Sequence, residues 1–249
     1  MDKKKIIGIV GAILAVVLIV FFFVFFIQKP VAKNSVGSNL AKNESDEVRK
    51  MLEVNRAAVD NAGVIGELPL LSEKDRLDGD FKAKVKIIVY EDLADNFSGK
   101  FDETITEIKN KFGNSVVLAY RYFIFKGDDV GLKSAEAAEC AGDQGKFMEM
   151  RKLLLDKSKN EDLRLTEFGS YAKSLGLDEA KFNKCLDAEK YKESIEKSVE
   201  NIRNTVVFGV PTIYVGDEVI TGARLFKDSV NGNKEKVEGM ESVINRHLK

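Results

Sequence analysis

Residues 85–98 read VKIIVYEDLADNFS, and this stretch decides the fold. Its opening run, residues 85–90, is almost continuously apolar and β-branched, which is typical of a strand covered on both faces. After a short acidic loop, one apolar stripe recurs at helical spacing: Phe97, Phe101, Ile105, Ile108 and Phe112. Gly113 supplies a stop signal for that helix. The stretch therefore predicts a central strand followed by an amphipathic helix.

The next apolar run, residues 116–123, predicts a second strand. A strand, a helix and a strand in this order imply parallel pairing through a right-handed crossover. From about residue 131 to 205 the pattern becomes helical only, which predicts an inserted group of helices. These helices are expected over residues 134–140, 146–155, 166–175, 178–186 and 191–204.

The sheet is predicted to resume after the insertion. Residues 212–215 and 218–221 form two short runs around a Gly-Asp turn suited to a hairpin. Residues 234–247 are amphipathic and are predicted as a closing helix. The sequence thus predicts one α/β domain over residues 75–249.

The N-terminal part reads as a membrane anchor. Residues 6–27 carry no charge and are long enough to cross a bilayer as a helix, which rises about 1.5 Å per residue. No small-x-small cleavage site follows, which favours an uncleaved anchor over a signal peptide. Three lysines in residues 1–5 favour a cytoplasmic N-terminus, although Lys29 and Lys33 dilute this bias. We expect a single-pass protein of the cytoplasmic membrane, bound to the lipid bilayer, with its C-terminal domain extracytoplasmic.

A stalk over residues 28–74 is expected to join this anchor to the domain. Residues 30–43 are polar and lack hydrophobic periodicity, as in a flexible linker. Ser45 is placed to cap a short helix that would end near Gly63.

Charge and cysteine content narrow the functional classes. The chain has 39 Lys and Arg against 40 Asp and Glu, so it has no basic excess with which to neutralise a phosphate backbone. We therefore expect no nucleic-acid partner. The two cysteines, Cys140 and Cys185, suit one disulfide in an exported domain or two buried thiols in a cytosolic domain.

Metal and histidine chemistry find little support. The only histidine is His247, which removes most zinc sites and most histidine-activated nucleophiles. Glu91, Asp92 and Asp95 cluster after the first strand but lack calcium-loop spacing, and we interpret them as a solvated acidic patch. We expect no metal and no cofactor.

The order of elements resembles the thioredoxin-fold oxidoreductases of the DsbA family. Residues 85–93 resemble the stretch that leads into that family's active site, and residues 135–141 and 145–147 resemble its first inserted helices. Residues 182–186 and the Gly-Val-Pro-Thr step at 209–212 complete the likeness, which covers about residues 75–249. It implies an α/β thioredoxin fold with an α-helical insertion, here preceded by one transmembrane helix.

The resemblance also exposes a departure at the active site. In that family, Cys-x-x-Cys stands at a helix N-terminus, where the helix dipole stabilises a thiolate. The aligned residues here are Asp95, Asn96, Phe97 and Ser98. Dithiol exchange proceeds through thiolate attack and has no nucleophile at this site. Ser98 lacks a histidine base, and Asp95 is explained as a helix cap, so we predict no catalytic residue and lean against an enzyme.

The likeness implies a binding surface and a disulfide. Pro211 aligns with the family's cis-proline, beside which an extended peptide pairs with the backbone. The implied substrate-binding set is Asp95, Asn96, Phe97, Ser98, Val210, Pro211 and Thr212. By the same resemblance, Cys140 pairs with Cys185 in a structural disulfide.

Three functions are compatible with these features. The first is a membrane-tethered module that has lost redox chemistry and binds extended or unfolded polypeptide in a chaperone-like role. The alternatives are a thiol–disulfide oxidoreductase of the DsbA class in the cell envelope and a structural envelope protein. Insulin reduction by the purified protein separates the first two.

Overall fold

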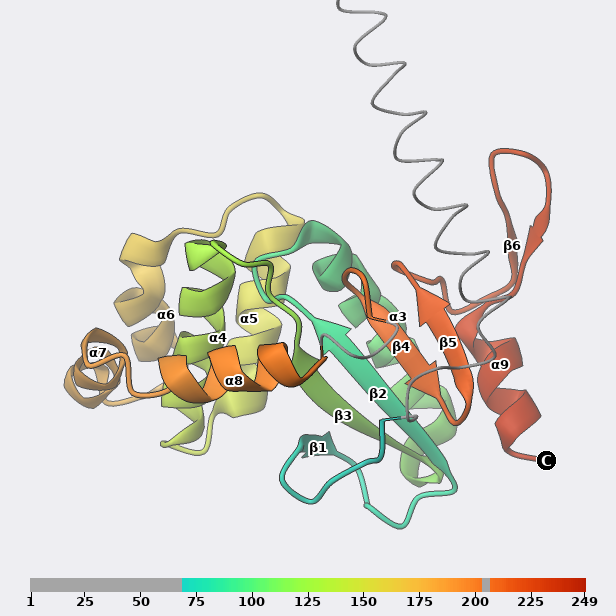
Figure 1. Ribbon diagram of the computed structural model, residues 1–249, viewed down its shortest axis with the longest axis horizontal. Helices are drawn as coiled ribbons and strands as arrows, with labels where there is room; N and C mark the ends of the chain where they lie inside the picture. The colour runs from blue at the N-terminus through green and yellow to red at the C-terminus, as the bar shows by residue number, and fades with distance from the viewer. Residues whose placement is uncertain (1–68, 203–206) are drawn as a thin grey trace, which may run out of the picture. The chain divides into compact units, whose positions relative to one another are not determined.

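Two parallel strands form the centre of the domain (Figure 1). β2 (Val85–Glu91) and β3 (Val116–Tyr122) are joined through α3 (Asn96–Phe112) and the short 3-10 helix η1 (Gly113–Ser115). The computed structural model describes residues 69–202 and 207–249, so the predicted anchor, stalk and stalk helix lie outside the described residues. Within those two ranges, no helix is long and apolar enough to cross a bilayer.

Three further strands complete a sheet in the order β1-β3-β2-β4-β5. β4 (Thr212–Val215) pairs antiparallel with β2, and β5 (Glu218–Thr221) forms the predicted hairpin with β4. β1 (Arg76–Asp78) pairs antiparallel with the outer edge of β3 and was not predicted, because three residues carry no periodicity. The parallel pairing of the two central strands is confirmed.

Side chains that alternate along the strands pack into two separate apolar cores, one on each face of the sheet. On one face of the sheet, α3 and α9 (Met240–His247) cover a large apolar cluster that includes Ile87 and Leu118. On the other face, a smaller cluster includes Tyr90, Tyr214 and Ile202. This burial on both faces explains why β2 and β3 read as continuous apolar runs.

The insertion between β3 and β4 is helical, as predicted, and lies to one side of the sheet in Figure 1. It has its own core, which includes Leu154, Phe168 and Phe182. A disulfide joins Cys140 to Cys185, with their Cα atoms 5.8 Å apart, as the resemblance implied. Its helices are α4 (Asp129–Gly142), α5 (Phe147–Lys159), η2 (Leu165–Glu167), α6 (Phe168–Ser174), α7 (Glu179–Asp187) and α8 (Lys192–Ile202).

The predicted closing helix over residues 234–247 is wrong in its first part. A small hairpin of β6 (Ser229–Val230) and β7 (Lys236–Val237) occupies this region, and α9 begins only after Gly239. The first N–H groups of α9 donate to the carbonyls of residues 225 and 226, at 3.0 and 2.9 Å. A Cβ on Gly239 would lie 2.3 Å from the carbonyl carbon of Lys227, so this close approach fixes where the helix starts.

Candidate functional site

The sheet register brings three chain segments to one end of the sheet. β2 ends at Glu91, whose carbonyl accepts a hydrogen bond from the N–H of Phe123, at 3.0 Å, just after β3. On the other side of β2, Tyr90 lies opposite Thr212 at the start of β4. The loop that leads into α3, the loop after β3 and the Pro211 step therefore meet at the same end of the sheet.

The four residues at the redox positions form the start of α3. Asp95 is the N-cap, and its carboxylate accepts a hydrogen bond from the N–H of Ser98 at 2.6 Å. The hydroxyl of Ser98 is buried and accepts a hydrogen bond from the N–H of Asp92 at 3.3 Å. Phe97 points outward and is 56% exposed. Asp95 and Ser98 therefore serve as local hydrogen-bonding groups that order the loop and the first turn of the helix.

The C-terminal end of α5 packs against this turn and the loop before it, and forms hydrogen bonds with both. The amide of Asn96 donates to the carbonyl of Lys159 at 3.0 Å, and the hydroxyl of Ser158 donates to the carbonyl of Leu93 at 2.7 Å. Gly99 allows the two helices to approach closely, because a Cβ there would lie 2.5 Å from the carbonyl oxygen of Leu155. The loop is therefore held on both sides of Asp95 by the C-terminal end of α5.

The interpretation of the acidic cluster as a solvated patch is wrong for two of its three members, because Glu91 and Asp92 are 1% and 3% exposed. Asp92 accepts a hydrogen bond from the N–H of Ala94 at 2.8 Å, and its other oxygen packs against Gly131. Burial, together with the nearby carboxylates of Asp128 and Asp95, raises the pKa of Asp92 to about 7, and the hydrogen bond from the N–H of Ala94 opposes this shift. A carboxyl group that holds a proton near neutral pH therefore lies behind the loop.

Glu91 is buried in an ion pair. Both of its oxygens accept hydrogen bonds from Arg151, each at 2.6 Å, and Arg151 also bonds Asp102 of α3 at 2.6 Å. The guanidinium lies over the ring of Tyr120, 3.7 Å from its centre. Burial raises the pKa of Glu91, and the charge of Arg151 opposes that shift. Sequence reasoning missed Arg151, because it lies sixty residues from Glu91 and no local pattern connects them.

The Val210–Pro211 peptide bond is cis, as the resemblance implied. Pro211 and Thr212 are buried, and the carbonyl of Pro211 accepts a hydrogen bond from Gly222 at 2.8 Å. Val210 is half-buried, and among residues 69–202 and 207–249 no group forms a hydrogen bond with its backbone N–H or carbonyl. The step therefore presents, at the end of the sheet, backbone groups that no residue in the described ranges pairs with.

Exposed phenylalanines lie on the same three segments. Phe97 opens α3, Phe125 follows β3, and Phe208 precedes the Pro211 step, and each is more than half exposed. The ring of Phe125 packs edge-on against Phe123, with centroids 5.3 Å apart. Aromatic side chains of this kind supply large apolar contact area to a partner.

The part of the chain that the structure describes contains no group of three His, Cys, Asp or Glu side chains arranged to hold a metal ion. The expected absence of a metal or cofactor remains a prediction.

Solved structures share the fold of this chain. Oxidised BdbD from Bacillus subtilis matches with a TM-score of 0.60 and 20% identity, over 74% of this chain and 98% of BdbD. Alpha-DsbA1 of Wolbachia pipientis matches with a TM-score of 0.54 and 23% identity, over 72% of this chain and 92% of that protein. At these identities the likeness shows the fold alone.

Sequence comparison adds a relative and a family. The Na(+)/H(+) antiporter NhaA 1 of Salinispora arenicola (strain CNS-205) is 29% identical over 148 residues, which cover 59% of this chain but 22% of the antiporter. This chain thus spans under a quarter of that relative's length. A family model described as thioredoxin matches residues 71–236, well over half of the chain and nearly the whole of the described domain. The chain therefore belongs to the thioredoxin family, and its described part is a DsbA-like thioredoxin-fold domain with a helical insertion.

Proposed function

We propose that this domain binds extended polypeptide at the end of the sheet that carries Asp95–Ser98 and Pro211, and that it has lost thiol–disulfide chemistry. The observation that carries the proposal is the backbone of Val210 beside the cis-proline, which forms no hydrogen bond with any residue that the structure describes. A free N–H and carbonyl at the end of a sheet can pair with an added strand. Phe97 and Phe208, which are both more than half exposed, would supply apolar contact to that strand.

The residues at the redox positions support the second half of the proposal. The chain has two cysteines, and both are joined in the disulfide between α4 and α7. At the N-terminus of α3, where a thiolate would gain from the helix dipole, the carboxylate of Asp95 already accepts the N–H of Ser98. Neither Asp95 nor Ser98 can form the mixed disulfide through which exchange proceeds.

The location that we propose is the outer face of the cytoplasmic membrane. The apolar run of residues 6–27 supports a tether there, and the Cys140–Cys185 bond fits an oxidising compartment. In this setting the domain would hold unfolded or extended chains close to the membrane.

A peptide-binding experiment tests the proposal on the full chain in lipid nanodiscs. The probe is fluorescein-labelled α-lactalbumin that has been reduced and carboxymethylated, followed by anisotropy. We expect saturable binding that weakens roughly a hundredfold in Phe97→Ser plus Phe208→Ser, because each of the two lost apolar contacts contributes about 1.5 kcal/mol and each step of about 1.4 kcal/mol is tenfold. Leu165→Ser is the matched control, because Leu165 is also exposed but lies in the insertion.

Two outcomes would contradict the proposal. Equal affinity of the wild type and the double variant would show that the peptide does not bind at this end of the sheet. Insulin reduction by the wild-type chain above the uncatalysed rate would instead support the alternative function, a thiol–disulfide oxidoreductase. The shared fold of alpha-DsbA1 is compatible with that alternative.

A further inference from the structure

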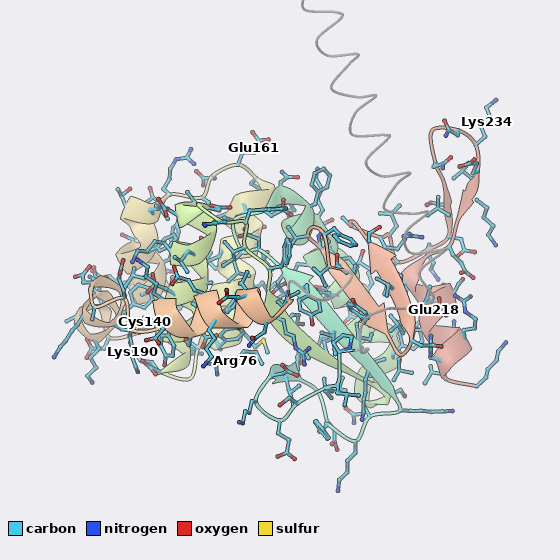
Figure 2. All side chains as sticks on the ribbon, in the orientation of Figure 1. Arg76, Cys140, Glu161, Lys190, Glu218 and Lys234 are labelled. Carbon is cyan, nitrogen blue, oxygen red and sulfur yellow. A yellow bond between two sulfur atoms is a disulfide. The ribbon has the colours of Figure 1, made fainter. Side chains whose placement is uncertain are left out.

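A concave site lies away from the predicted peptide-binding residues. It is a cleft of about 790 Å³ between β1, the outer part of β3 and α8, and none of the predicted peptide-binding residues lines it. Arg76, labelled in Figure 2, comes from β1 and is one of its lining residues. Pockets of roughly 300–1,000 Å³ suit small organic ligands, so the cleft has the size of a ligand site.

The sequence of α8 explains why the cleft is open. The side of α8 that packs inward carries Ile195, Val199 and Ile202, which reach the apolar clusters. The adjoining stripe carries Ser194, Ser198 and Asn201, and these polar residues line the cleft. Because these side chains are small and polar, they do not close the space between the helix and the sheet.

Aromatic side chains form much of the opposite wall. Tyr90, Tyr122 and Tyr191 line the cleft, whereas the ring of Tyr120, which also borders it, is buried in the cluster under α3 against Arg151. The hydroxyl of Tyr122 donates to Glu139 at 3.1 Å, and the hydroxyl of Tyr90 accepts from Arg121 at 3.1 Å. These bonds hold the phenol groups of Tyr90 and Tyr122 in place, so this part of the lining is preorganised to contact a flat apolar body.

The charges of the lining leave a cationic surplus. Arg121 is paired with Asp75 through two bonds of 2.8 Å, and Arg76 is paired with Glu139. Lys74 is exposed and has no ion-pair partner among the described residues. Arg76 uses only part of its five N–H donors on Glu139, so further donors remain free. The free donors and the surplus charge favour a ligand with an anionic group.

We propose that this cleft binds a small organic anion with an aromatic body, such as an aryl carboxylate. The aromatic part would lie against the tyrosines and α8, and the anionic group would face Lys74 and Arg76. The cleft is separate from the proposed peptide-binding end of the sheet, so this proposal does not depend on peptide binding there.

Calorimetric titration of the full chain in nanodiscs with biphenyl-4-carboxylate tests the proposal, with empty nanodiscs as the blank. We expect saturable one-to-one binding. Biphenyl-4-carboxamide, which has the same body without the charge, should bind about tenfold more weakly, since hydrogen bonds to charged groups are the stronger ones. Lys74→Gln should remove most of that difference, and Lys82→Gln, an exposed lysine outside the cleft, should leave it unchanged.

A second variant tests the location. Ser198→Trp places a large ring in the cleft and should weaken binding at least tenfold, whereas Ser170→Trp on the exposed face of α6 should not. Binding of the carboxylate that is equal in Ser198→Trp and the wild type, or equal affinity for carboxylate and carboxamide, would overturn the proposal. An absence of saturable heat with the wild type would overturn it as well.

Discussion

The carboxylate of Asp95 accepts a hydrogen bond from the backbone N–H of Ser98 at 2.6 Å. These are the two positions at which the DsbA resemblance places redox cysteines. The helix N-terminus that would stabilise a thiolate is thus occupied by another anion, which satisfies one of the free N–H groups of α3. The cis Val210–Pro211 bond lies at the same end of the sheet, and α5 supports the first turn of α3.

Two cysteines introduced at these positions should give the chain thiol–disulfide activity. In Asp95→Cys plus Ser98→Cys, the first thiol would stand at the N-terminus of α3, where the dipole lowers its pKa. We expect insulin reduction well above the uncatalysed rate, measured by turbidity with dithiothreitol as the reductant. Asp95→Ser plus Ser98→Cys, which lacks the N-terminal thiol, is the control and should stay inactive. A double-cysteine variant that folds but remains inactive would show that more than the two sulfurs has been lost.

Local patterns predicted the centre of the fold well. β2, α3, β3 and the β4–β5 hairpin follow from periodicities within single elements, and the structure places them as expected. The start of α9 was misjudged because the apolar spacing continues across Gly239, whereas a tertiary contact with residues 225–227 decides where the helix begins.

The buried polar groups could not be predicted. Asp92 directly follows β2, in a short loop with two other acidic residues nearby. It is covered by Gly131 of α4, which is far away in the sequence. Arg151 pairs with Glu91 across sixty residues of sequence. The redox positions themselves were identified from the resemblance, because no periodicity or spacing in this sequence marks Asp95 or Ser98 as special.

The buried carboxyl of Asp92 should make stability depend on pH. Its pKa is about 7 in the folded chain and 3.8 ordinarily, so the folded state keeps a proton that the unfolded state releases. The stability from this proton is present below about pH 4 and is lost as pH rises to about 7. Asp92→Asn should stay neutral, so the wild type should lose up to about 4 kcal/mol relative to it between pH 4 and pH 8.

Urea unfolding at several pH values, followed by circular dichroism, measures this difference. Asp217→Asn, in the exposed turn between β4 and β5, is the matched control for the loss of one carboxyl group. If the gap between wild type and Asp92→Asn were independent of pH, Asp92 would have to be ionised in the folded state.

The close crossing of α3 and α5 should make Gly99 sensitive to one methyl group. A Cβ there would lie 2.5 Å from the Leu155 carbonyl oxygen and 2.9 Å from Cβ of Lys159, so the helices must move apart. Gly99→Ala should cost about 1–3 kcal/mol of unfolding free energy, despite alanine's better helix propensity. Gly232→Ala, where a Cβ would meet nothing within 4 Å, is the control. A neutral or stabilising Gly99→Ala would mean that the two helices are not packed this tightly.

Arg151 should be required for the stability of the fold, mainly because the carboxylates that it pairs with are buried. Arg151 is 3% exposed and Glu91 is 1% exposed, so Arg151→Met would leave a carboxylate without a counter-charge in the interior. We expect a loss of about 3–5 kcal/mol in urea unfolding. Replacing Glu91 as well, in Glu91→Gln plus Arg151→Met, should recover a large part of that loss, because no unpaired charge then remains at Glu91. Equal losses in the single and the double variant would show that packing over Tyr120, and not charge pairing, accounts for the role of Arg151.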